Sequence, residues 1–136
     1  MTDFVSEVQK IPYNTERVFA KLSDFKNLEK VHPLLPEGKI KDLSFDSDIC
    51  SFYAEPIGKI SMRIVERDPR KSIKLISEKS PVPFTCWIQL KEDDSGETQL
   101  KLTFRADIPF IFKGIVSKPL EEGIRKLAEA LATLPY

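Results

Sequence analysis

The chain has few of the residues on which catalytic sites, metal sites and disulfide-stabilised folds depend. Its 136 residues include one histidine, two cysteines and five glycines. Cys50 and Cys86 belong to no CxxC pair and to no cluster with histidine, so the sequence supports neither a zinc site nor a redox motif. We expect both thiols to be reduced and buried, and we expect no metal and no cofactor.

The chain also lacks an excess of one charge and a long apolar run. Basic and acidic residues each total 21, which gives a formal net charge of zero and no footprint for nucleic acid. The longest apolar stretch, residues 108–116, is broken by Lys113 and is far shorter than the roughly 20 residues that span a bilayer. The first residues show no signal-peptide pattern. We therefore expect a cytoplasmic protein without a membrane span.

The residues that are present suffice for one core. With 41% hydrophobic residues, a chain of this length can fold without metals or disulfides, so we expect residues 1–136 to form a single domain. Residues 3–11 are rich in β-formers. They predict a first strand with Phe4, Ser6 and Val8 on one face.

Helical signals follow this strand. Asn14 offers a side-chain cap for a short helix over residues 15–22. Phe25, Leu28 and Val31 then recur at helical spacing and predict a second short helix, which ends where prolines begin.

Between residues 39 and 107 the apolar residues recur at every second position, and turn signals divide the segment. No helical pattern interrupts it, so hairpins should connect the strands and the sheet should be antiparallel. The six predicted strands are residues 40–45, 49–55, 59–67, 72–78, 84–91 and 98–106.

The last part of the chain returns to helical spacing. The apolar positions are three or four apart and predict one helix of about 22 residues. Pro119 removes a backbone hydrogen bond inside this helix and should bend it near Ile115. The residues that define the apolar stripe are Phe112, Val116, Leu120, Ile124, Leu127, Leu131 and Leu134.

This element order has few compact solutions, and we expect an α+β helix-grip fold. A seven-stranded antiparallel sheet would wrap around the long C-terminal helix, with two short helices between strands 1 and 2. The sequence resembles the helix-grip superfamily of START domains, birch-pollen-type allergens, polyketide cyclases and the carbon monoxide dehydrogenase G subunit. The resemblance implies a hydrophobic cavity between sheet and helix. It rests on the segments Ile11 to Phe19, Leu22-Ser23-Asp24, Gly58 before the strand from Ile60 to Arg67, and the helix from Leu120 to Leu131.

Several side chains combine aromatic, thioether and hydroxyl groups on faces that should point inward, which is typical of a ligand pocket. Each of them also fits an ordinary core, and it is the combination with a gripped, bent helix that favours a cavity. We expect binding of a small hydrophobic or amphipathic molecule, with Tyr53 and Ser77 as polar anchors. The predicted ligand-binding residues are Tyr53, Met62, Leu75, Ser77, Phe84, Cys86, Phe104, Phe112 and Val116.

Two other functions stay open. An enzyme of the polyketide cyclase or dehydratase kind would use His32 or Tyr53 for proton transfer, although no acid and base pair is evident. A protein-interaction module, resembling the chaperone-activator branch of the superfamily, would use the outer face around Trp87. The sequence does not decide the oligomeric state, and a homodimer stays open.

Overall fold

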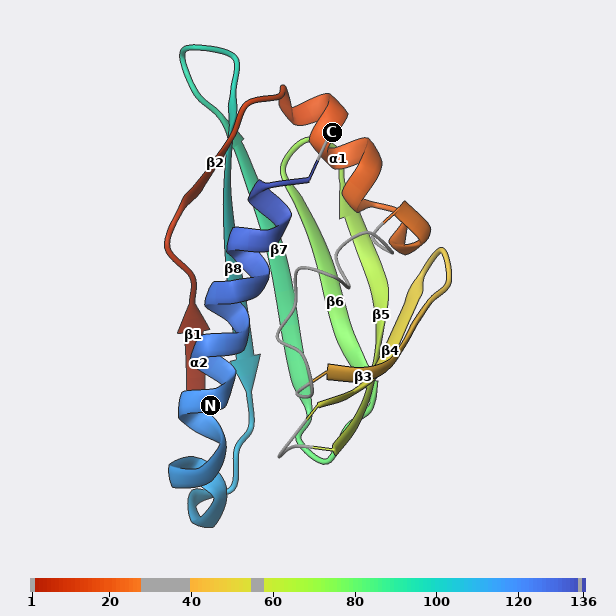
Figure 1. Cartoon of the computed structure of the whole chain (residues 1–136), viewed down its shortest axis with the longest axis vertical. Helices are drawn as coiled ribbons and strands as arrows, with labels where there is room; N and C mark the ends of the chain where they lie inside the picture. Colours follow the sequence, from red (N-terminus) through yellow and green to blue (C-terminus); the bar gives the residue numbers. More distant parts are fainter. Residues whose placement is uncertain (1, 28–39, 55–57, 135) are drawn as a thin grey trace.

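A computed structural model describes residues 2–27, 40–54, 58–134 and 136 of the chain (Figure 1). Its helices and strands, in chain order, are β1 (Thr2–Val5), β2 (Gln9–Ile11), α1 (Thr15–Leu22), β3 (Ile40–Phe45), β4 (Ile49–Ala54), β5 (Gly58–Asp68), β6 (Ser72–Lys79), β7 (Phe84–Glu92), β8 (Thr98–Ala106) and α2 (Phe110–Ala132).

The strands form one antiparallel sheet in the order β1-β8-β7-β6-β5-β4-β3, and β2 also pairs with β8. Consecutive strands from β3 to β8 are neighbours, as hairpin connections require. Figure 1 shows α2 lying along one face of this sheet, which we call the inner face. The α+β helix-grip fold predicted from the sequence is thereby confirmed, with the predicted first strand divided into β1 and β2.

The division of the first strand changes which side chains point inward. Val5 of β1 pairs with Thr103, and Gln9 of β2 pairs with Leu100. The segment between Val5 and Gln9 therefore has one residue more than the opposite segment of β8, which is a β-bulge. Ser6 bridges the break, because its N–H donates to the carbonyl of Leu102 and its Oγ accepts from the N–H of Leu102, both at 2.8 Å. The extra residue turns Val8 outward, where it is 57% exposed, and brings Ile11 into the core. The prediction that Val8 shares a face with Phe4 was therefore wrong.

Helix α1 begins where the sequence predicted. The side chain of Asn14 accepts a hydrogen bond from the N–H of Arg17 at 2.8 Å and so caps the first turn. Val18 and Leu22 on its apolar side are completely buried. After α1, residues 25–27 form a single 3₁₀ turn, and the rest of the second predicted helix lies outside the described residues.

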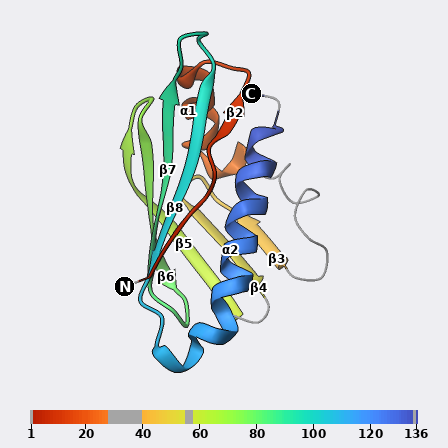
Figure 2. The same ribbon diagram turned by 90° about the vertical axis from the view of Figure 1, so that its left-hand side faces the viewer.

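Helix α2 lies closest to β8, β1 and β2, at one side of the sheet. Its second half is buried at Ala128 and Leu131. Pro119 lies inside the helix, and Figure 2 shows that the first turns run in a different direction from the rest. No helix in the described part of the chain has the length and apolar character that crossing a bilayer requires.

The buried apolar side chains form two clusters. The first joins α1, the middle of the sheet and the second half of α2, and Leu131 and Ile73 are among its members. The second lies between the sheet and the first half of α2. It consists of Phe4, Ile60, Phe84, Ala106, Ile108 and Val116.

Leu131 tests how tightly the sheet grips α2. Leu131 is 2% exposed, so Leu131→Ala should lower the free energy of unfolding by about 2–5 kcal/mol through lost transfer energy and a residual void. Ile111 on the same helix is 75% exposed, and Ile111→Ala should change the free energy of unfolding by about 0.5 kcal/mol or less. Urea unfolding of both variants measures the difference, and equal costs would contradict the grip.

Candidate functional site

The inner face carries a band of apolar side chains that the fold does not completely bury. Phe52, Met62 and Ile124 pack against both core clusters, yet each keeps solvent-accessible surface. Similar side chains adjoin them on the strands and on the middle of α2. We call this set the inner strip: Phe52, Met62, Cys86 and Phe104 from the sheet, and Leu120, Ile124 and Leu127 from α2.

The helix is buried on both sides of the inner strip. Val116 toward the beginning of α2 and Leu131 toward its end are 7% and 2% exposed. Leu120, Ile124 and Leu127 lie between them on the same stripe and are only partly buried. These three positions of α2 are therefore less completely buried than Val116 and Leu131.

Aromatic rings form one end of the inner strip. The rings of Phe84 and Phe104 are stacked, with centroids 4.7 Å apart and planes inclined by 27°. Phe4 meets Phe104 from β1, with ring centroids 6.3 Å apart. Such stacked and tilted arrangements hold the rings in place, so this end presents a rigid apolar wall.

A hydroxyl group lies beside the apolar side chains. Ser77 of β6 is in register with Met62 of β5, so the two residues lie on the same face of the sheet. The Ser77 Oγ accepts a hydrogen bond from the N–H of Phe84 at 3.1 Å. This bond orients the hydroxyl and leaves its own proton able to donate.

Most of the predicted ligand-binding residues lie together on the inner face. Met62, Cys86 and Phe104 belong to the inner strip. Others are buried next to it, within the two clusters. These buried residues are Leu75 at 2% exposure, Phe84 at 7% and Val116 at 7%.

Tyr53 lies on the other face. The inward positions of β4 are Cys50 and Phe52, which pair with Met62 and Ile60. Tyr53 is consequently on the outer face, where it is 41% exposed, and the inward orientation read from the sequence was wrong.

Phe112 also stands apart from the inner strip. It lies in the first turn of α2 and is 46% exposed. Sequence reasoning had not assigned Phe52 to the site, because apolar residues occupy both phases of β4. Leu120 and Ile124 were recognised only as a helix stripe, and nothing in their spacing distinguishes a partly buried position from a closed one.

The described residues of the inner strip offer burial more than acid and base chemistry. Among the residues that the structure describes, no three His, Cys, Asp or Glu side chains gather as metal ligands would. Cys50 is buried as expected, whereas Cys86 is only partly buried, so that expectation was wrong for Cys86. Desolvation raises the pKa of both thiols from 9.0 to about 12, which keeps both neutral. His32, which the enzymatic alternative invokes, lies outside the described residues.

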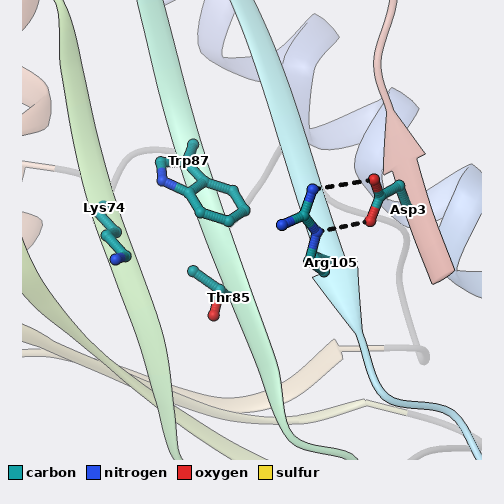
Figure 3. Close-up of a pocket in the computed structure, with 5 residues that line it drawn as sticks. All are labelled: Asp3, Lys74, Thr85, Trp87 and Arg105. Carbon is teal, nitrogen blue, oxygen red and sulfur yellow. Dashed lines mark hydrogen bonds and ion pairs between the residues drawn. The ribbon is translucent and has the colours of Figure 1, made fainter. Parts of the chain in front are cut away.

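The outer face has an open depression, which Figure 3 shows in close-up. Arg105 donates from Nε and Nη2 to the two carboxylate oxygens of Asp3 at 2.9 and 3.3 Å, which lowers the pKa of Asp3. The Arg105 guanidinium and the Lys74 ammonium lie 5.6 and 5.9 Å from the centroid of the Trp87 ring. Thr85 completes the lining. The charged groups of the depression are thus already engaged with one another or with the Trp87 ring. A protein-interaction function of this face stays a prediction.

No family model and no curated protein matches the sequence. Solved structures do resemble it. A protein from Chromobacterium violaceum is 21% identical, with 98% of this chain and 97% of that one covered and a TM-score of 0.68. A START superfamily protein from Mycobacterium smegmatis is 14% identical, with 96% and 94% covered and a TM-score of 0.63. Norcoclaurine synthase from Thalictrum flavum is 15% identical, with 96% and 84% covered and a TM-score of 0.70. The chain therefore has the helix-grip fold of START-like and Bet v 1-like proteins.

The two thiols should react with a characteristic pH dependence. Because the pKa of Cys50 and Cys86 rises from 9.0 to about 12, the thiolate fraction at pH 8 should be about a thousandfold lower in the folded protein than in the unfolded chain. The native alkylation rate with iodoacetamide should rise tenfold per pH unit up to about pH 10, whereas the rate in urea should level off near pH 9. Native thiols that react at pH 8 as fast as the thiols of the unfolded chain would contradict the raised pKa.

Proposed function

We propose that the protein binds a small hydrophobic or amphipathic molecule between the inner face of the sheet and α2. The observation that carries the proposal is the inner strip, whose apolar side chains keep accessible surface in the middle of the molecule. Protein interiors are close-packed, so a core of this size would ordinarily cover such side chains. A ligand that covers them removes apolar surface from water, at about 25 cal/mol for each Å².

The side chains indicate the chemistry of the ligand. Met62 and Phe104 suit an apolar body, since a thioether adapts to irregular shapes and a ring offers a flat face. Ser77 lies beside Met62 and supplies one hydrogen-bond donor for a polar end. Cys86 adds a small, neutral contact. We therefore assign ligand contact to these residues, with Leu75, Phe84 and Val116 as the packed wall behind them.

The shared fold supports the same function. START-like and Bet v 1-like proteins typically bind hydrophobic ligands. The fold also occurs in norcoclaurine synthase, so it is compatible with catalysis as well as with binding. We favour binding because the described inner strip consists of apolar side chains and one neutral thiol, which can bury a molecule but offer little for proton transfer.

A tryptophan at position 62 should occupy the space in which the ligand binds. Met62 is partly buried and packs on both clusters, so the larger indole of Met62→Trp should fill accessible space. We expect at least tenfold weaker binding of the neutral apolar dye N-phenyl-1-naphthylamine, with a shift in Tm of less than about 4 °C, which corresponds to about 1 kcal/mol or less. Fluorescence titration and thermal unfolding measure the two quantities.

Ile76→Trp is the matched control. Ile76 lies on the neighbouring strand β6 but is 37% exposed on the outer face, so this variant should bind the dye like the wild type. Unchanged dye binding in Met62→Trp, or an equal loss in Ile76→Trp, would refute the proposed site. Strong destabilisation of Met62→Trp would show that the region is a filled core.

A further inference from the structure

The beginning of α2 exposes a concentrated apolar surface. Phe110, Ile111, Phe112 and Ile115 are 86%, 75%, 46% and 58% exposed, and we call these four residues the α2 tip. The other large apolar side chains that are exposed in the described chain come singly or in pairs from other elements. Figures 1 and 2 both show the first turns of α2 as the lowest part of the molecule. Contiguous apolar surface of this kind marks an interaction site.

The geometry of the α2 tip suits a fluid partner better than a rigid one. Successive helix residues point about 100° apart, so Phe110, Ile111 and Phe112 face three different directions. A folded protein that packs on a helix contacts one side of it, along positions three and four apart. Lipid chains can surround a helix end on several sides. The apolar surface is thus spread in the way that insertion into a lipid layer requires.

The charges near the α2 tip complement an anionic surface. Between Asp107 and Glu121 the segment contains two lysines, Lys113 and Lys118, and no acidic residue. Both lysines are exposed, and the first turn of α2 carries no acidic side chain. Lys118 lies about 10 Å along the helix axis from Ile111, at about 1.5 Å per residue. Interfacial helices are buried by about 5–10 Å, which would place this ammonium group at the level of the headgroups.

The local backbone separates the α2 tip from the gripped part of the helix. The helix changes direction around the segment that contains Pro119, so the tip is not held flat against the sheet (Figure 2). Apart from its own stretch of helix, a Cβ atom added at Gly114 would meet no atom within 4 Å, so this side of the helix is open. A bilayer can therefore approach this side of the tip without displacing any of the described helices and strands.

We propose that the α2 tip inserts into the surface of an anionic lipid bilayer and anchors the protein there peripherally. The proposal does not depend on the ligand site, because Phe110 and Ile111 are not part of the inner strip. It requires no membrane-spanning helix, since only the first two turns of α2 enter the interface. The apolar side chains supply the insertion energy, and Lys113 and Lys118 supply the preference for negatively charged lipids.

Vesicle sedimentation tests the proposal. The wild type should co-sediment with vesicles of phosphatidylcholine and phosphatidylglycerol, and less with phosphatidylcholine alone. The double variant Phe110→Ser/Ile111→Ser should partition on the order of 100-fold more weakly, because two large apolar side chains no longer enter the lipid. Lys113→Gln/Lys118→Gln should lose about tenfold on the mixed vesicles and little on phosphatidylcholine alone.

Two further variants separate insertion from a general effect of surface polarity. Val8→Ser/Val65→Ser removes two apolar side chains that are 57% and 46% exposed elsewhere, and it should sediment like the wild type. Phe110→Trp should retain binding, and its emission should shift to the blue on the mixed vesicles because the indole leaves water. Trp87 contributes a constant background, since it lies on the outer face of the sheet.

The outcomes that overturn the proposal are distinct from failure of the ligand site. Absence of wild-type sedimentation, undiminished sedimentation of Phe110→Ser/Ile111→Ser, or an equal loss in the Val8 and Val65 control would each refute membrane insertion. A concentration-dependent dimer that this Phe110 and Ile111 variant abolishes, without vesicle binding, would assign the α2 tip to a second copy of the chain. The same variant should bind N-phenyl-1-naphthylamine normally, so each proposal can fail alone.

Discussion

The structure depends on the need for one helix to cover a sheet much wider than itself. Seven strands stand side by side in the sheet, and at about 4.8 Å between neighbours they extend over about 30 Å. A helix with its side chains is only about 10–12 Å across. Helix α2 therefore lies close to β8, β1 and β2, and only side chains bridge the distance to the more remote strands. Two bulges between β5 and β6, with the extra residues Val65 on β5 and Glu78 on β6, help the sheet to bend, and the inner strip remains where coverage is incomplete.

Much of this architecture follows from hydrophobic periodicity, and its failures have identifiable causes. The strand predicted over residues 84–91 is observed as β7, Phe84–Glu92, because its alternation leaves one possible phase. Tyr53 was placed inward since β4 has apolar residues in both phases, and pairing with β5 decides between them. Val8 was misplaced because a bulge depends on the partner strand and leaves no mark in the local pattern. Such errors arise wherever register is set by residues distant in sequence.

The candidate site could be predicted only in outline for a related reason. Periodicity identified Met62, Cys86 and Phe104 as inward, which the structure bears out by placing all three on the inner face. Periodicity identifies an inward side chain but not how completely its neighbours cover it, and the structure shows Leu75 buried and Met62 only partly buried. The sequence also could not predict that the first turn of α2 is exposed. Phe112 and Val116 follow the same helical spacing as the apolar residues in the buried second half of the helix.

The pairing of β1 with β8 also has a consequence for how the protein is made. Thr2 pairs with Ala106, so β1 must wait for β8, the last strand of the described chain, before it can enter the sheet. At a synthesis rate of about 5–20 residues per second, this wait lasts about 5 to 20 s. Contacts of such long sequence separation are slow to form even in the completed chain. Until β8 has been synthesised, Phe4 therefore lacks the strand against which it is buried in the folded protein.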